Sequence, residues 1–180
     1  MLKVNLPDIE KIERARRSRR VPVVFTRGEV EQVLSRASGI HPLILSLLYG
    51  TGMRLSECLS LRVKDLDFER LEITIREGKG EKDRRTMLPR RLVPALHRQL
   101  GYARGLHQQD LEEGFGEVEL AYALTRKYPH AAREWGWQYL FPAAHRSKDS
   151  RTGRVGRHHL LEHGVQRAMK KALHEAGIHK

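Results

Sequence analysis

The chain has 180 residues, which is enough to bury a core and fits the usual size of one domain. Lysine and arginine number 34 against 22 acidic residues, and the net charge of +12 indicates a polyanionic partner, although basic faces that only keep a protein dispersed give the same total. A single cysteine excludes a disulfide framework, and no apolar run is long enough for a membrane span or a secretory signal. We therefore expect a cytoplasmic protein whose leading partner is nucleic acid.

Residues 1–22 are rich in arginine and poor in apolar residues, which predicts a basic linker ahead of one domain over 23–180. Thr26 and Glu29 have the spacing of a capping box, so a helix is expected to begin near Arg27.

The stretch HPLILSLLYGTGMRLSECLS predicts two short helices. The first is apolar and is expected to end at Gly50 and Gly52. The second is brief, with Leu55 and Leu59 on its apolar side. Cys58 in the second helix is expected to be a small core residue and not a nucleophile.

Alternating apolar residues predict a β-hairpin over 71–89, with glycines at Gly78 and Gly80 breaking the two strands. From Pro89 to Gln109 the apolar residues lie three or four apart, which predicts a long helix with a basic polar face.

The last third of the chain is less regular. Residues 110–142 combine glycines, a helical patch from Val118 to Leu124 and both tryptophans, which indicates an insertion on the scaffold. A polar loop follows, and an apolar stripe then predicts a final helix that Gly177 closes. The fold class expected from these elements is α+β, mostly helical with a small antiparallel hairpin or sheet.

Arg54 and Glu57 are the first candidates for chemistry. They lie three residues apart on the predicted helix, where the carboxylate can orient the guanidinium so that it holds a phosphate by two hydrogen bonds. A structural salt bridge explains the same pair.

The hairpin tip GKGEKDR presents Lys79 and Lys82, which can reach a nucleic-acid groove or protonate a leaving oxygen, but a solvated turn has the same composition. No Walker A pattern surrounds the tip, which argues against a nucleoside-triphosphate site.

Taken in order, the segments GTGMRLSE, LRVKDLDF and GKGEKDRRTMLP resemble the catalytic domain of tyrosine recombinases, the phage integrase family. The resemblance implies that Arg54 binds the scissile phosphate, that Glu57 supports Arg54, and that Lys79 is the general acid. Lys82 and Arg84 are the DNA contacts expected on the hairpin. The reaction of this family needs no metal and no other cofactor.

A narrower resemblance links FGEVELAYALTRKYPHAAREWGWQYLFPA and RHHLLEHGVQRAMKKALHEAGIHK to integron integrases, and RARRSRRVPVVFTRGEV to the linker of that prokaryotic subfamily. Integron integrases recombine gene cassettes at attC sites folded from one DNA strand, and their insertion grips bases extruded from that hairpin. An aromatic plane can hold an unstacked base at roughly 1–3 kcal/mol. A small satellite core explains the WGW triplet equally well. The expected DNA contacts are Trp135, Trp137, Tyr139, Pro142, His158 and His159, together with Arg16, Arg17 and Arg20 of the linker.

The resemblance stops at the C-terminal end of the chain. The family carries an H-x-x-R box and a nucleophilic tyrosine, which forms a 3′-phosphotyrosyl link, and neither follows the final EAGIHK. His130 and Arg133 have the H-x-x-R spacing, but they lie in the expected insertion. None of the tyrosines has the context of the nucleophile, so we nominate none.

We therefore expect a truncated catalytic domain that cannot cleave DNA by itself and whose uncovered apolar surface favours self-association. A non-enzymatic DNA-binding module is the alternative, and an interaction protein on the same scaffold is a third possibility. His159 and His163 have a zinc-compatible spacing without further ligands, so no metal is expected.

Overall fold

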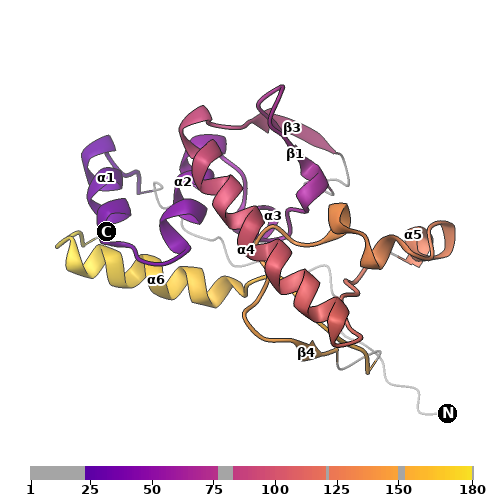
Figure 1. The fold of residues 1–180 in the computed structure, drawn as a ribbon. Coiled ribbons are helices and arrows are strands. Elements are labelled where there is room, and N and C mark those ends of the chain that lie inside the picture. Colours follow the sequence, from indigo (N-terminus) through magenta and orange to yellow (C-terminus); the bar gives the residue numbers. More distant parts are fainter. Residues whose placement is uncertain (1–22, 77–82, 121, 150–152, 180) are drawn as a thin grey trace, which may run out of the picture.

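The structure is a computed structural model that describes residues 23–76, 83–120, 122–149 and 153–179. Helices pack around a small antiparallel sheet and enclose an apolar core, which confirms the expected α+β class (Figure 1). The α-helices of the described residues are α1 (Arg27–Arg36), α2 (His41–Thr51), α3 (Leu55–Leu59), α4 (Val93–Glu112), α5 (Tyr122–Lys127) and α6 (Glu162–Glu175). The strands are β1 (Leu66–Asp67), β2 (Glu72–Ile75), β3 (Arg84–Met87), β4 (Ser147–Lys148) and β5 (Val155–Gly156). Single turns of 3₁₀-helix are η2 (Val63–Asp65), η3 (Arg90–Leu92), η4 (Ala131–Arg133) and η5 (Trp135–Trp137).

Helix α1 begins at Arg27, as the capping box predicts. The Thr26 hydroxyl accepts the backbone N–H of Glu29 at 3.3 Å, and the Glu29 carboxylate accepts the backbone N–H of Thr26 at 2.7 Å. At the other end of α1, Arg36 Nε donates to the carbonyl of Glu175 at 2.8 Å. This bond ties α1 to the end of α6, and the two helices lie side by side at one end of the molecule (Figure 1).

Helix α2 runs to Thr51 and ends at Gly52, whose φ of +65° is a conformation that glycine adopts readily. Gly50 lies inside this helix, so the prediction that it ends the helix was wrong. A Cβ atom at position 50 would lie 2.8 Å from Cγ of Pro89. Glycine at this position therefore lets α2 approach the turn that leads into α4.

The three-stranded sheet has the order β1-β2-β3, with antiparallel pairing on both sides of β2. Ile73 and Ile75 of β2 are buried, as the alternation of apolar residues predicts. Ile75 is paired with Arg84, so Arg84 lies next to the hairpin tip and beside the buried end of β2.

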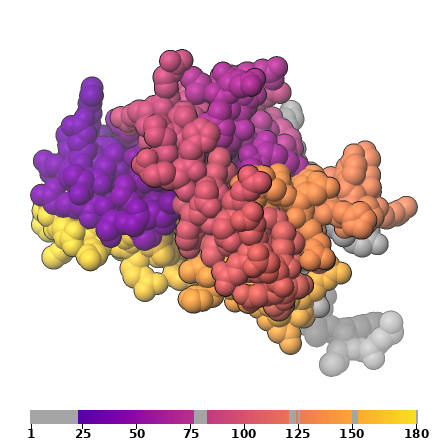
Figure 2. Space-filling view, in the orientation of Figure 1, coloured from indigo at the N-terminus to yellow at the C-terminus, as the bar shows by residue number. Residues whose placement is uncertain are grey.

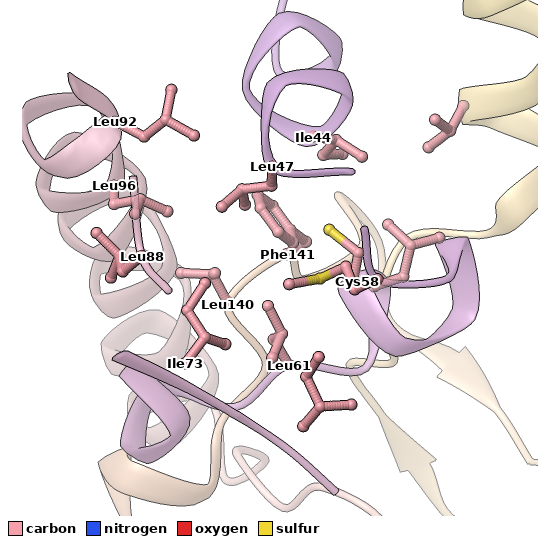
Figure 3. Close-up of a cluster of buried hydrophobic side chains, with 14 residues drawn as sticks. Ile44, Leu47, Cys58, Leu61, Ile73, Leu88, Leu92, Leu96, Leu140 and Phe141 are labelled. Atoms are coloured by element: carbon pink, nitrogen blue, oxygen red, sulfur yellow. The ribbon is translucent and has the colours of Figure 1, made fainter. Parts of the chain in front are cut away.

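The core is formed by side chains from α2, α3, β2, α4, α6 and the segment 138–143 (Figure 3). Leu47, Cys58, Leu96 and Phe141 are each 0% exposed. Burial raises the pKa of the Cys58 thiol to about 12, which confirms that this cysteine is a core residue.

The segment 138–143 is bound as a strand would be on both of its sides. Leu140 N–H donates to the carbonyl of Leu61 at 2.8 Å, and Leu160 N–H donates to the carbonyl of Phe141 at 2.9 Å. Gln99 of α4 adds a buried hydrogen bond of 2.8 Å from Nε2 to the Leu140 carbonyl. These bonds hold the region that follows the tryptophans against the core.

The predicted helical patch from Val118 to Leu124 was wrong in its first half. Val118 is buried ahead of α5, and its N–H donates to the carbonyl of Ala132 at 3.0 Å. That bond to a distant part of the chain replaces a helical one. Helix α5 projects from the body at the opposite end from α1 and α6 (Figure 2).

An apolar cavity of about 480 Å³ lies between α1, α2, α3 and α6. Its walls include Val33, Leu48, Leu55 and Met169. None of the helices described here is long and apolar enough to span a bilayer.

Candidate functional site

Arg54 is the N-cap residue of α3, directly after the turn that ends α2. Its backbone is extended, with φ −73° and ψ 157°, and its N–H donates to Oε2 of Glu57 at 2.7 Å. Nη1 of its guanidinium donates to Oε1 of the same carboxylate, also at 2.7 Å. Glu57 therefore holds both the backbone and the side chain of Arg54, as their spacing of three residues predicts.

Arg84 of β3 binds the same carboxylate from the sheet. Its Nη1 and Nη2 groups donate to Oε1 and Oε2 of Glu57 at 2.9 Å and 2.8 Å, which is the two-bond geometry of an arginine and a carboxylate. The side chain of Glu57 is only 8% exposed. Hydrogen bonds from Arg84 in the first place, and from Arg54, lower the pKa of Glu57 to about 2, so the group is ionised at neutral pH.

The guanidinium of Arg54 is accessible although Glu57 beneath it is buried. The side chain of Arg54 is 54% exposed. In the described part of the chain, Nη1 is the only nitrogen of this guanidinium with a hydrogen-bond partner. The arrangement can therefore present Nε and Nη2 to an anion while the side chain is held in place.

The hairpin that follows is held next to its tip by a second buried carboxylate. Asp65 accepts Nε of Arg76 at 2.6 Å, and Nη1 of Arg76 lies 3.7 Å from Asp83 on the other side of the hairpin. The tip between them, with the expected general acid Lys79 and the expected DNA contact Lys82, lies outside the described residues. The linker residues Arg16, Arg17 and Arg20 also lie outside them.

Asp65 is fixed by a turn that repeats the pattern of Arg54 and Glu57. The backbone N–H of Arg62 donates to Oδ2 of Asp65 at 2.9 Å. The guanidinium of Arg62 turns inward and donates to the carbonyls of Trp137 at 2.8 Å and Glu119 at 2.9 Å, and to the hydroxyl of Tyr139 at 3.1 Å. Arg62 thereby joins the turn η2 to the aromatic part of the expected insertion.

The two tryptophans lie on the 3₁₀ turn η5 but contact different neighbours. The ring of Trp135 stacks at 6.1 Å on that of His107 in α4, which is the kind of contact that a satellite core makes. Trp137 lies under Lys64, whose Nζ is 2.6 Å from the centre of the ring. Burial of the ammonium at this contact, followed by the charge of Arg76, lowers the pKa of Lys64 to about 8, although the residue as a whole is exposed.

His158 and His159 are brought together with Tyr139. Their rings lie 4.0 Å from each other and 5.4 Å and 5.2 Å from the ring of Tyr139. Pro142 pairs with His159 across a β-bridge. Burial lowers the pKa of His159 and raises that of Tyr139, so both are neutral at pH 7. The group places two half-buried histidine rings against the buried ring of Tyr139.

The histidine pair is anchored to α4 by its neighbour Arg157. Nε and Nη2 of Arg157 donate to the buried carboxylate of Asp110 at 2.6 Å and 2.7 Å, and Nη1 donates to the carbonyls of Ala143 and Ala144. Arg146 also approaches Asp110 and pairs with Glu113.

Sequence reasoning missed most of the supporting residues. The sequence contained a signal for Arg62 and Asp65, because R-x-x-D repeats the R-x-x-E spacing of Arg54 and Glu57 a few residues later. It contained none for the pairing of Arg157 with Asp110, which joins residues 47 positions apart. The zinc-like spacing of His159 and His163 has no helical basis, because α6 begins only at Glu162.

Comparison with known proteins fits this geometry. The model of the phage integrase family matches residues 24–180. Proteins called integrase/recombinase from Escherichia coli and Pseudomonas aeruginosa are 49% identical over all 180 residues, which cover 53% of their own length. The tyrosine recombinase XerA of Pyrococcus horikoshii is 35% identical over 94 residues, or 52% of this chain and 33% of that protein. A crystal structure of XerA recombinase shares the fold with a TM-score of 0.54 and 23% identity, covering 89% of this chain and 46% of that one.

The fold has an arginine at the start of α3 beside a β-hairpin, and the family model matches most of the same chain. The chain belongs to the phage integrase family, the tyrosine recombinases. It spans about half the length of the curated relatives that it matches.

Proposed function

We propose that this chain is part of a site-specific DNA recombinase of the integron cassette type. In this proposal it binds DNA, supplies the first catalytic arginine and the hairpin lysine, and leaves the H-x-x-R box and the nucleophilic tyrosine to sequence beyond it. The domain limits follow the same proposal, with a linker over 1–22, a partial catalytic domain over 23–180 and an insertion near 110–142. The observation that carries it is the Arg54 guanidinium, anchored by Glu57 yet open to an anion, on a chain that belongs to this family.

The chemistry proposed for this site is the stabilisation of a phosphodiester under attack. A guanidinium with free N–H groups can bind two oxygens of one phosphate and offset the charge that develops on it. Lys79 is proposed to protonate the leaving 5′-oxygen. Covalent attachment to a tyrosine conserves the bond energy, so the reaction proposed here requires no metal or ATP.

The aromatic part of the molecule is proposed to hold bases extruded from a folded single strand. Trp137, Pro142, His158 and His159 are the proposed contacts, with Trp135 as a further one, and the adjacent histidine rings, of which burial lowers the pKa of His159, support stacking. Lys64 covers one face of Trp137, so a base stacked on that ring takes the other face or displaces the ammonium. A displaced Lys64 would be available to a phosphate of the same nucleotide.

The test compares two DNA probes in fluorescence anisotropy at several salt concentrations. One is a hairpin with extrahelical bases, and the other is the same hairpin fully paired. We expect tighter binding of the first, with an affinity that falls steeply as salt rises. Equal affinity for the two probes would contradict the integron-type proposal, and absence of salt-dependent binding would contradict DNA binding as a whole.

A non-enzymatic DNA-binding module predicts the same binding. A nicked DNA substrate, which traps covalent intermediates, separates the recombinase proposal from this alternative. We expect no SDS-stable complex from this chain alone. We expect strand cleavage when the same residues are part of a longer chain that carries the tyrosine. An SDS-stable adduct from this chain alone would contradict the proposed division of the active site.

Self-association of the chain is proposed from the apolar cavity between α1, α2, α3 and α6. Lined almost wholly by apolar side chains, it is a surface that another apolar element would cover. Sedimentation velocity over a range of concentrations tests this, and a monomer at all of them would contradict it.

A further inference from the structure

The carboxylate of Glu57 serves two arginines unequally. Arg84 uses two side-chain nitrogens on it, at 2.9 Å and 2.8 Å, whereas Arg54 uses one, Nη1, at 2.7 Å. An arginine and a carboxylate on their own favour two parallel hydrogen bonds. Here Arg84 has the two-bond position, and Arg54 has a single side-chain bond.

The acceptor sites of the carboxylate are filled by this arrangement. Oε1 accepts Nη1 of both arginines, and Oε2 accepts Nη2 of Arg84 and the backbone N–H of Arg54. Since each carboxylate oxygen has two lone pairs, Arg54 has no second acceptor on Glu57. Two guanidiniums share one negative charge, so a net positive charge remains for an anion.

From this geometry we infer that Arg84 is a positioning residue for the phosphate site. By occupying Glu57 it prevents a two-bond pairing of that carboxylate with Arg54, and it leaves Nε and Nη2 of Arg54 for a DNA phosphate. The inference rests on the proposed function, because it gives Arg84 a role in the Arg54 site. It replaces the expectation that Arg84 itself contacts DNA.

One further observation supports this role, and the neighbouring residue provides a control. Hydrogen bonds from Arg84 are the first cause of the lowered pKa of Glu57, in agreement with its two side-chain bonds to the carboxylate. The next residue, Arg85, pairs instead with Glu72 at 3.4 Å, and its side chain is 67% exposed. Because successive residues of a strand face opposite ways, Arg85 carries the same charge on the other face of β3 and is a matched control.

The experiment measures binding of this chain to a fluorescent hairpin DNA in a series of potassium chloride concentrations. We expect Arg54→Gln and Arg84→Gln each to weaken binding about tenfold, the value of one charge-assisted contact. The double variant R54Q/R84Q should be no weaker than R54Q, because Arg84 acts through Arg54. The double variant E57Q/R84Q should bind severalfold more tightly than R84Q, because the competing carboxylate is gone. Arg85→Gln should lose much less than R84Q.

A direct DNA contact by Arg84 predicts the opposite pattern and would overturn the inference. The losses of R54Q and R84Q would then add, the salt slope would fall by about one further unit in R54Q/R84Q, and removal of Glu57 would restore nothing. Unchanged binding by R84Q would overturn it as well.

Folding is checked by circular dichroism for every variant. If Arg84→Gln does not fold, Arg84→Lys decides instead: a direct phosphate contact predicts wild-type affinity, whereas the positioning role predicts weaker binding, since an ammonium cannot occupy both oxygens in a fork. The failure of the proposed function is a separate result, in which the wild-type chain does not bind DNA or R54Q binds as well as wild type.

Discussion

Two turns of this protein are built alike and used differently. In each, an arginine with extended backbone precedes a short helix and donates its N–H to a carboxylate three residues later, Arg54 to Glu57 at 2.7 Å and Arg62 to Asp65 at 2.9 Å. Both carboxylates are buried. Each accepts a second arginine that lies next to the hairpin tip, Arg84 for Glu57 and Arg76 for Asp65.

The difference lies in where the guanidinium goes. That of Arg54 is largely outside, with 54% of the side chain exposed, and that of Arg62 is inside on two carbonyls and the hydroxyl of Tyr139. Burial lowers the pKa of Arg62, whereas its partners restrain that shift. The same local motif therefore places the backbone in both turns, and the surroundings of the guanidinium decide whether the arginine is structural or available to a ligand.

Removal of the buried guanidinium should have the largest effect. Arg62→Ala leaves the carbonyls of Trp137 and Glu119 without this donor and removes the contact of 3.8 Å with the ring of Tyr139, so we expect a loss of about 3 kcal/mol in the free energy of unfolding. Urea denaturation measures it. Arg70→Ala, at an arginine that is 71% exposed, is the control and should cost less than about 0.5 kcal/mol. Equal losses would show that the two turns do not differ as described.

Glu57→Gln should come next, with a loss of about 2 kcal/mol at neutral pH, because two guanidiniums lose their shared counter-charge. The pKa of Glu57 is about 2 in the folded chain and 4.5 as an ordinary glutamate. The ionised carboxylate therefore adds stability that is present above pH 4.5 and is lost as the pH falls towards 2. Denaturation at several pH values should show a shallower acid decline in this variant. Glu31→Gln, at an exposed glutamate, should keep the wild-type decline.

Arg54→Gln should separate binding from stability. We expect about tenfold weaker DNA binding and a salt slope lower by about one unit, with a change in unfolding free energy of less than about 0.5 kcal/mol, since the side chain is half exposed. Anisotropy titrations and urea denaturation on the same preparation measure both. A large loss of stability would make Arg54 a structural residue like Arg62.

The smallest effect is expected at Lys64, beside the second turn. Lys64→Met keeps an apolar cover on Trp137 but removes the cation, which should change the unfolding free energy by about 0.5 kcal/mol. In the wild type, NMR titration of the lysine Nζ should give a midpoint near 8. Because the folded pKa is lowered, this group makes the protein more stable as the pH rises from about 8 towards 10.5. A midpoint at the ordinary lysine value would contradict the contact.

Local features of the sequence predicted much of this structure. The start of α1 follows from Thr26 and Glu29, and the Arg54–Glu57 contact from a spacing of three, because both depend on neighbouring residues only. The pairing of Arg84 with Glu57 spans 27 residues and depends on the register of β2 and β3. The contact of Arg62 with Trp137 spans 75 residues and depends on how the segment 138–143 packs, which no short-range pattern encodes.

The strand-like segment 138–143 limits how this protein can be shortened. Leu140 and Phe141 are fully buried and fall within the expected insertion of 110–142, yet they fill the same core as α2 and β2. A deletion of the whole range would remove core as well as appendage, so a trimmed variant has to be rejoined before Gln138. The segment 138–143 therefore belongs to the scaffold, and a trimmed variant also has to keep the Trp137 and Glu119 carbonyls that accept from Arg62.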